Sequence, residues 1–247
     1  MLEQTVPPSE IILVEDGPLT PELYAAISFY EQKPFFHTVK LPNNFGLGIA
    51  LREGIKHCSN ELIARMDTDD YSVPNRIEKQ LAIFEKNPEL DVVGCWENEF
   101  SGDSIERVSS CHKVPEQHKN IVNFMRKRCA LLHPTVVFKK KAVLKAGNYR
   151  HNYLFEDYDL FLRMVQTGAK CYNIQEGLYY LRINPNLFKR RGGYRYALTQ
   201  LKFKFNMFRS GFSSFKDFLI SGIGHFCVCI MPNRSRVLFY KIVLRRG

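Results

Sequence analysis

The chain has 247 residues, of which 45% are hydrophobic and 24% are charged, a composition typical of a folded globular protein rather than a disordered one. The first residues, MLEQTVPPSE, have neither the basic nor the apolar region of a secretory signal, and no run reaches the roughly 18 apolar residues of a membrane span. The seven cysteines are scattered and include no CxxC pair, which argues against a zinc ribbon or a disulfide framework and favours reduced thiols in the cytosol.

The net charge of +10 is unevenly distributed along the chain. From Arg182 to Gly247 there are 14 lysines and arginines and one acid, Asp217, whereas the preceding residues hold 21 basic and 24 acidic side chains. The tail therefore carries +13 and the body −3. Because the tail is also rich in phenylalanine and tyrosine, we expect it to contact an anionic surface, either membrane headgroups or nucleic acid.

Strand and helix signals alternate through the first part of the chain. Short apolar runs predict strands at residues 11–14, 37–42, 61–66 and 91–96. Helices are predicted between them, at residues 20–32, 43–58 and 74–88. Thr20 and Pro21 suit the N-cap and the first position of the first helix. This alternation predicts βαβ units and a mostly parallel sheet flanked by helices.

Beyond residue 100 the alternation is less regular. The sequence predicts a strand and a short helix within residues 133–147, a helix within residues 153–170 and a strand at residues 171–183. Gly168 suits the end of that helix. We therefore expect an α/β domain over residues 1–185, followed by a basic, aromatic-rich helical tail over residues 186–247.

Acidic side chains follow two of the predicted strands, in the motifs EDG, from Glu15, and DTDD, from Asp67. Ligands of parallel sheets bind at these carboxyl ends. Helix capping would explain one aspartate of DTDD but not three together. A calcium-binding EF-hand loop is excluded because its sixth position, which requires glycine, would be Ser72. The pattern D-x-D suits a divalent cation that also reaches phosphate oxygens, and no glycine-rich phosphate loop is present to replace it. We predict a metal–diphosphate site, with a purely structural role as the alternative.

The order of six motifs resembles that of the GT-A family 2 glycosyltransferases of bacterial surface-polysaccharide synthesis, and in particular the subgroup of amylovoran-biosynthesis transferases. The motifs are VEDGPLTPEL, NFGLGIALREGI, ELIARMDTDDYSVPNRIEKQ, DVVGC, HPTVVFKKKAVLKAGNY and FEDYDLFLRMVQTGAK. The resemblance implies a GT-A fold with a mixed, mostly parallel sheet. It also implies inverting, metal-dependent transfer from a nucleotide-diphosphate sugar to a polysaccharide or a polyprenyl-linked saccharide, as in capsule or lipopolysaccharide synthesis.

The resemblance also implies roles for single residues on the donor side. Asp16 matches the acid that contacts the nucleotide base, with Glu15 beside it in the nucleotide-sugar site. Asp67 and Asp69 match the D-x-D motif of the metal site, with Asp67 also towards the ribose and Asp69 as the direct ligand of Mg²⁺ or Mn²⁺.

On the acceptor side, Asp157 of FEDYD matches the catalytic base, while its neighbours Glu156 and Asp159 either share the site or cap their helix. Arg190 and Arg191 of KRRGG either bind the diphosphate or are solvated. The segment HPT is predicted to be a turn into a strand, with a site-lining role as the alternative.

The resemblance further implies a strand and a helix ahead of the segment that begins at Thr5, which only four residues precede. We therefore expect the natural active form to begin upstream of Met1 and this chain to be a poor enzyme. The alternatives are a non-catalytic family member and a nucleic-acid-binding protein, the latter resting on the pI of 9.2 alone. We expect a cytoplasmic protein, peripheral on the inner face of the cell membrane; in the alternative, the tail aromatics cover the sheet or form a homodimer contact.

Overall fold

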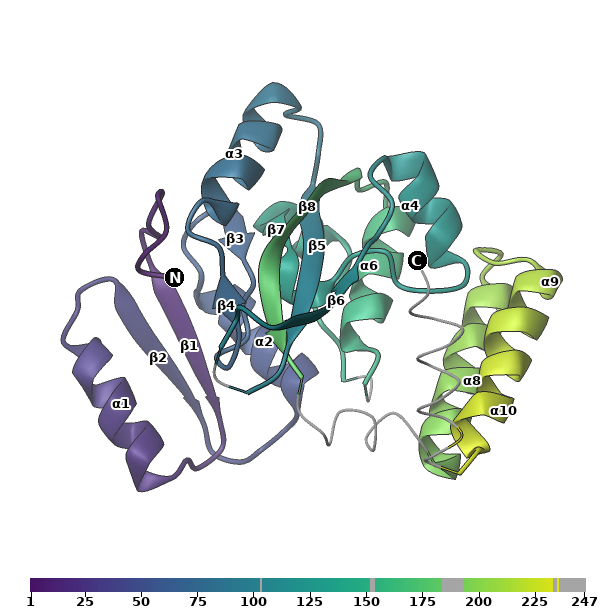
Figure 1. The fold of residues 1–247 in the computed structure, drawn as a ribbon, viewed down its shortest axis with the longest axis horizontal. Coiled ribbons are helices and arrows are strands. Elements are labelled where there is room, and N and C mark those ends of the chain that lie inside the picture. Colours follow the sequence, from purple (N-terminus) through teal and green to yellow (C-terminus); the bar gives the residue numbers. More distant parts are fainter. Residues whose placement is uncertain (103, 152–153, 184–192, 233–234, 236–247) are drawn as a thin grey trace. The chain divides into compact units, whose positions relative to one another are not determined.

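The computed structural model of the chain describes residues 1–102, 104–151, 154–183, 193–232 and 235 (Figure 1). The chain divides into two units, each assembled from separate stretches of sequence. The first unit consists of residues 1–64, 74–92 and 137–170, and the second of residues 65–73, 93–136 and 171–247. The predicted domain boundary at residue 185 lies outside the described residues and stays a prediction.

The first unit opens with a parallel strand pair. Strands β1 (Ile11–Asp16) and β2 (Phe36–Leu41) are joined by helix α1 (Pro21–Glu31), which lies against β2 (Figure 1). The side chain of Thr20 accepts a hydrogen bond from the backbone N–H of Leu23, so the predicted N-cap is confirmed. This is the βαβ unit that the alternating pattern predicts.

The other strands of the first unit are β3 (Leu62–Ala64) and β7 (Val137–Lys139), which pair antiparallel. Its remaining helices are α2 (Leu47–His57), α3 (Arg76–Lys86), α5 (Lys140–Lys145) and α6 (Glu156–Gln166). Within the described residues β1 pairs with β2 alone and β3 pairs with β7 alone, so β1 and β3 each have one backbone edge that no other strand covers.

The second unit is built on two long strands, β5 (Val92–Phe100) and β8 (Cys171–Arg182), which lie side by side (Figure 1). The short strand β4 (Tyr71–Ser72) pairs antiparallel with β8, and β6 (Val108–His112) pairs antiparallel with β5. The first four residues of β5 are all buried, because this strand is covered on both faces. The pairing of β4 with β8 fixes the chain that leaves the DTDD motif.

Helices complete the second unit. Helix α4 (His118–Met125) contacts β8, and the predicted turn at HPT is a short 3₁₀ helix (His133–Thr135). The described part of the tail is helical, as predicted, and forms a hairpin (Figure 1). Its helices are α8 (Tyr194–Arg209), α9 (Phe215–Phe218), the π-helical η2 (Leu219–Gly224) and α10 (His225–Ile230). None of the helices in the described ranges has both the length and the apolar character needed to cross a bilayer.

Candidate active site

The three aspartates of the DTDD motif lie in an acidic loop, residues 67–70, of the second unit. The guanidinium of Arg65 donates two hydrogen bonds to the carboxylate of Asp67, from Nη1 to Oδ2 at 2.6 Å and from Nη2 to Oδ1. The arginine is buried, 7% exposed, whereas the aspartate side chain is 36% exposed. Such a fork-to-fork pair fixes both the position and the plane of the carboxylate. Asp67 is therefore oriented by the fold before any ligand binds.

Asp70 has a structural part in the same loop. Its Oδ2 accepts a hydrogen bond from the Tyr179 hydroxyl at 2.9 Å, and its Oδ1 accepts one from the Arg182 backbone N–H at 2.8 Å. Burial of this carboxyl raises its pKa to about 6, and burial likewise raises the pKa of the Tyr179 hydroxyl. Both partners belong to β8, so Asp70 ties the acidic loop to that strand. The purely structural role, which is the alternative to metal binding for the DTDD motif, thus applies to Asp70.

Asp69 differs from its two neighbours. Its backbone carbonyl accepts a hydrogen bond from Arg182 Nε at 3.0 Å, but its carboxylate has no hydrogen bond or ion pair to any residue in the described ranges. The residue is exposed. Both of its carboxylate oxygens can therefore accept an incoming ligand.

The donor set fits a Mg²⁺ or Mn²⁺ ion that is shared with a diphosphate. Such ions use one or two protein carboxylates and complete their coordination with water and phosphate oxygens. Across the described residues no group of three or more His, Cys, Asp and Glu side chains is arranged to hold a metal without such help. The exposed carboxylate of Asp69 and the oriented carboxylate of Asp67 supply the one or two protein ligands that such an ion requires.

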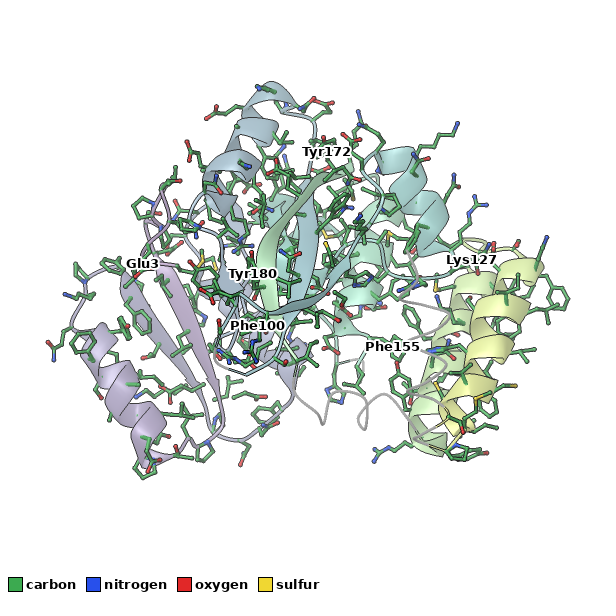
Figure 2. All side chains as sticks on the ribbon, in the orientation of Figure 1. Glu3, Phe100, Lys127, Phe155, Tyr172 and Tyr180 are labelled. Atoms are coloured by element: carbon green, nitrogen blue, oxygen red, sulfur yellow. The ribbon has the colours of Figure 1, made fainter. Side chains whose placement is uncertain are left out.

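Three further residues organise this loop although no motif in the sequence marks them, namely Arg65, Tyr179 and Arg182. Besides its bonds to the loop, the guanidinium of Arg182 donates to the Gly102 carbonyl and lies 4.7 Å from the ring centre of Phe100. The Phe100 ring in turn lies 6.5 Å from that of Tyr180 (Figure 2). The position of Arg65 two residues before Asp67 is the only local signal for any of the three.

The other predicted donor-side acids, Asp16 and Glu15, lie at the end of β1 in the first unit. Asp16 accepts hydrogen bonds from the backbone N–H groups of Phe45 at 2.8 Å and Gly46 at 2.9 Å, which lead into α2. Glu15 is 3% exposed and lies 3.7 Å from the ammonium of Lys40, its partner across the β1–β2 register. Asp16 thus fixes the start of α2, and Glu15 bridges the strand pair. Nucleotide binding by either residue stays a prediction.

The start of α2 lies against the segment that leads into α6. A Cβ atom on Gly48 would overlap the carbonyl oxygen of Arg150 and lie 3.1 Å from Cβ of Glu156. A Cβ atom on Gly46 would lie 3.8 Å from the ring of His151. The first unit therefore brings the chain held by Asp16 next to the residues that precede Asp157.

The first turn of α6 contains three acids, Glu156, Asp157 and Asp159, where the helix dipole favours negative charge. Asp159 forms an ion pair with Arg163 one turn later, at 2.7 Å, which gives it a structural role. The Oδ1 atom of half-buried Asp157 accepts a hydrogen bond from the N–H of Tyr158 at 2.7 Å. Leu154, two residues before the helix, has a φ of +60°, a conformation that side chains with branching rarely adopt.

The remaining predicted residues are the two arginines of the KRRGG motif and the HPT segment. Arg190 and Arg191 lie outside the described residues, so their role stays a prediction. His133 is buried, and both burial and the charge of Arg65 lower its pKa well below the usual value. Thr135 accepts a hydrogen bond from the Cys95 N–H at 3.2 Å and is also buried. The HPT segment is therefore part of the core of the second unit.

Solved structures with the same arrangement of elements are GT-A glycosyltransferases, and the chain has the GT-A fold. One is Staphylococcus aureus TarS in complex with UDP-GlcNAc, at a TM-score of 0.64 and 13% identity, covering 99% of this chain and 68% of that one. Another is the mannosyltransferase PcManGT of Pyrobaculum calidifontis in complex with GDP-Man and Mn²⁺, at a TM-score of 0.57 and 12% identity, covering 99% of this chain and 69% of that one.

Sequence similarity narrows the class to one family. Residues 1–146 match the model of glycosyl transferase family 2. The chain is 34% identical over 244 residues to the Escherichia coli UDP-Gal:alpha-D-GlcNAc-diphosphoundecaprenol beta-1,3-galactosyltransferase, covering 99% of this chain and 88% of that protein. It is 34% identical over 200 residues to the amylovoran biosynthesis glycosyltransferase AmsE of Erwinia amylovora, covering 81% and 74%. The chain belongs to glycosyl transferase family 2, which confirms the predicted resemblance.

Proposed function

We propose that this glycosyltransferase moves a sugar, with inversion, from a nucleotide-diphosphate donor to a polysaccharide or a polyprenyl-linked saccharide, with a divalent metal ion bound to its acidic loop. The observation that carries the proposal is the contrast within this loop. Asp67 is held by Arg65 and Asp70 by β8, while the exposed carboxylate of Asp69 has no partner among the described residues.

In this proposal the acidic loop binds the donor. Asp69 would hold Mg²⁺ or Mn²⁺, and Asp67, oriented by Arg65, would face the ribose. When bound, the metal offsets the negative charge that develops on the departing diphosphate. Asp16 and Glu15 contribute to the nucleotide site, and Arg190 and Arg191 to the diphosphate contacts.

Asp157 acts as the general base. A sugar hydroxyl is a poor nucleophile, and it must lose its proton as its oxygen bonds to the anomeric carbon of the donor. The Asp157 carboxylate takes that proton, and the bond from the anomeric carbon to the diphosphate oxygen breaks. Attack from the face opposite the leaving group inverts the configuration at that carbon.

The names of related proteins support these substrate classes. The E. coli relative is named for a UDP-linked galactose donor and a diphosphoundecaprenol-linked acceptor, and the two solved structures carry UDP-GlcNAc and GDP-Man. An acceptor on a polyprenyl carrier lies at the membrane. We therefore place the enzyme in the cytoplasm, peripheral on the inner face of the bacterial cell membrane, where the basic tail meets anionic lipid.

A thermal-shift screen tests the proposal. Binding to the folded state raises the melting temperature by mass action, so the true donor should raise it in the presence of Mn²⁺ and much less in its absence. A panel of UDP-, GDP- and dTDP-sugars covers the donor classes. If no nucleotide sugar shifts the melting temperature with or without metal, the proposed donor binding is wrong.

A further inference from the structure

The helix formed by α9, η2 and α10 has an apolar outer face. Its residues run without interruption from Phe215 to Ile230, and the exposed positions recur at helical spacing. The apolar stripe, as we call these residues, consists of Phe215, Leu219, Ile220, Ile223, Cys227 and Ile230. Four of its members are more than 43% exposed, namely Phe215 at 58%, Ile220 at 53%, Ile223 at 44% and Ile230 at 52%. Apolar side chains on a folded helix normally face the core instead.

The opposite face of this helix is firmly attached to α8. The amide of Gln200 donates to the Ser221 carbonyl at 2.6 Å, and the Gly193 N–H donates to the Cys229 carbonyl at 3.1 Å. A Cβ atom on Gly222 would lie 3.4 Å from Cβ of Lys204, so the two helices are in close contact there. The apolar stripe is therefore held outward by specific contacts on the inner face.

The neighbouring helix α8 exposes positive charge. Arg195, Lys202 and Arg209 of α8 are exposed and recur every seven residues, which places them on one face. Lys216 is exposed beside the stripe itself. The one acid of the tail, Asp217, is 8% exposed; it caps α9 through Ser214 and lies 3.6 Å from Lys127. The described surface of this hairpin thus exposes apolar and basic side chains, while the one acid of the tail is buried.

We propose that the apolar stripe inserts into the headgroup region of an anionic membrane, with the helix parallel to the surface and the α8 cations against lipid phosphates. The helix of 16 residues, about 24 Å long, is too short to cross a hydrocarbon core of about 30 Å, but it suits an interfacial position. A nucleic acid would use the cations and leave the stripe in water. A second copy of the hairpin would bring like charges together.

This inference rests on the proposed membrane association and specifies how it is achieved. The test is co-sedimentation of the full chain with phosphatidylcholine vesicles, with and without phosphatidylglycerol. Wild-type protein should bind the anionic vesicles. The charge variant R195Q/K202Q/R209Q should bind them about 100-fold more weakly. The stripe variant L219S/I220S/I223S should lose at least about tenfold, including in the high salt that screens the cations.

Matched controls separate these effects from general loss of charge or apolar surface. K33Q/K86Q/K145Q removes three exposed lysines of the first unit, and L23S/F29S/L144S removes three exposed apolar side chains there. Both should bind vesicles like wild type. Circular dichroism and melting temperature confirm that each variant folds.

A second readout follows insertion directly. Cys227 is the exposed one of the seven cysteines, so it can carry an environment-sensitive fluorophore, with Cys227→Ser as the control. Its emission should shift to the blue on anionic vesicles. Binding by the stripe variant at the wild-type level, or an unshifted emission, overturns the insertion while leaving electrostatic docking intact. If wild type binds no vesicles and light scattering shows that the stripe variant dissociates a dimer, the stripe is a subunit contact and both membrane proposals fail. Donor binding in the thermal-shift screen is independent of every one of these results.

Discussion

Arg65 and Asp67 form a two-point ion pair in which the arginine is buried and the aspartate faces solvent. If this pair orients Asp67 for the donor, either Arg65→Lys or Asp67→Asn should weaken donor binding, since a lysine cannot hold both carboxylate oxygens in one plane. The double variant should be no weaker than the worse single variant, which corresponds to a coupling of about 1 kcal/mol or more. Calorimetric titration of all four proteins with the donor from the screen measures this coupling. Independent, additive losses would show that the two residues act separately.

Asp69→Asn should abolish the metal dependence of donor binding while leaving the melting temperature nearly unchanged, because its exposed carboxylate has no partner in the described structure. Asp70→Asn is the matched control in the same loop. Its carboxylate accepts hydrogen bonds from Tyr179 and Arg182, so we expect a change in stability with the metal dependence retained. Calorimetry with and without Mn²⁺ distinguishes the two. Full metal dependence in the Asp69 variant would contradict its assignment as the ligand.

Asp157→Asn should keep donor binding and lose transfer by about 100- to 10,000-fold, because the amide has nearly the same shape and cannot accept the proton. Asp159→Asn serves as the control, since Asp159 is committed to Arg163 and should affect stability more than turnover. Single-turnover assays with a saccharide acceptor measure both. Turnover near the wild-type level in the Asp157 variant would shift the role of base to Glu156.

Gly48→Ala should lower the free energy of unfolding by about 1–3 kcal/mol, because the new methyl group would overlap the Arg150 carbonyl. It should also slow transfer, since the displaced segment leads into Asp157. Gly54→Ala on the same helix meets only the movable side chain of Val14, at 3.1 Å, and should change stability by less than about 1 kcal/mol. Urea melts and transfer assays of both variants provide the measurement. Equal behaviour of the two would show that the contact at Arg150 is not tight.

Stability should depend on pH through Lys204. Burial lowers the pKa of this lysine from 10.5 to about 7, against the smaller opposing effects of Cys129 and Asp217. Between these pH values the unfolded chain binds more protons than the folded chain. The free energy of unfolding should therefore rise with pH from about 7 to 10.5, by up to about 1.4 kcal/mol per pH unit. Above this window Lys204 is neutral in both the folded and the unfolded chain, so its burial no longer lowers the stability.

The variant Lys204→Met should lack this rise, although it also removes the hydrogen bond from Lys204 Nζ to the Lys127 carbonyl, at 2.9 Å. Lys202→Met, which changes an exposed lysine on the same helix, should keep the rise. Urea melts across the pH range measure both variants. A rise of the same size in Lys204→Met would assign it to other groups.

The local parts of this fold could be predicted from the sequence. The strands β1 and β2 and the helix between them follow from apolar runs and from the cap at Thr20, because each signal lies within a few neighbouring residues. No local signal in the sequence predicts the elements β4, β6 and α4. The strand β4 has only two residues, and it exists because β8 pairs with it from more than 100 residues away in the chain.

The candidate site likewise contains residues that the sequence can predict and residues that it cannot. Asp67, Asp69 and Asp157 could be chosen because they lie in contiguous acidic motifs, although their roles stay predictions. Tyr179 could not be chosen, since its hydroxyl meets the Asp67 N–H across a separation of 112 residues. Such a contact depends on strand register, and the sequence of β8 contains no local mark of it.

The packing of the strand pair β1–β2 and helix α1 affects how easily this segment unfolds locally. Among the residues of α1 only Ile27 is buried, and β1 has a strand partner on one side alone. Little apolar surface therefore opposes local unfolding of this segment, and its amide hydrogens should exchange before those of β5 and β8. Because Asp16, at the end of β1, holds the backbone that enters α2, we expect each opening to loosen the start of that helix, which packs beside the chain leading to Asp157. Opening at the edge of the first unit should then shift the position of the proposed base.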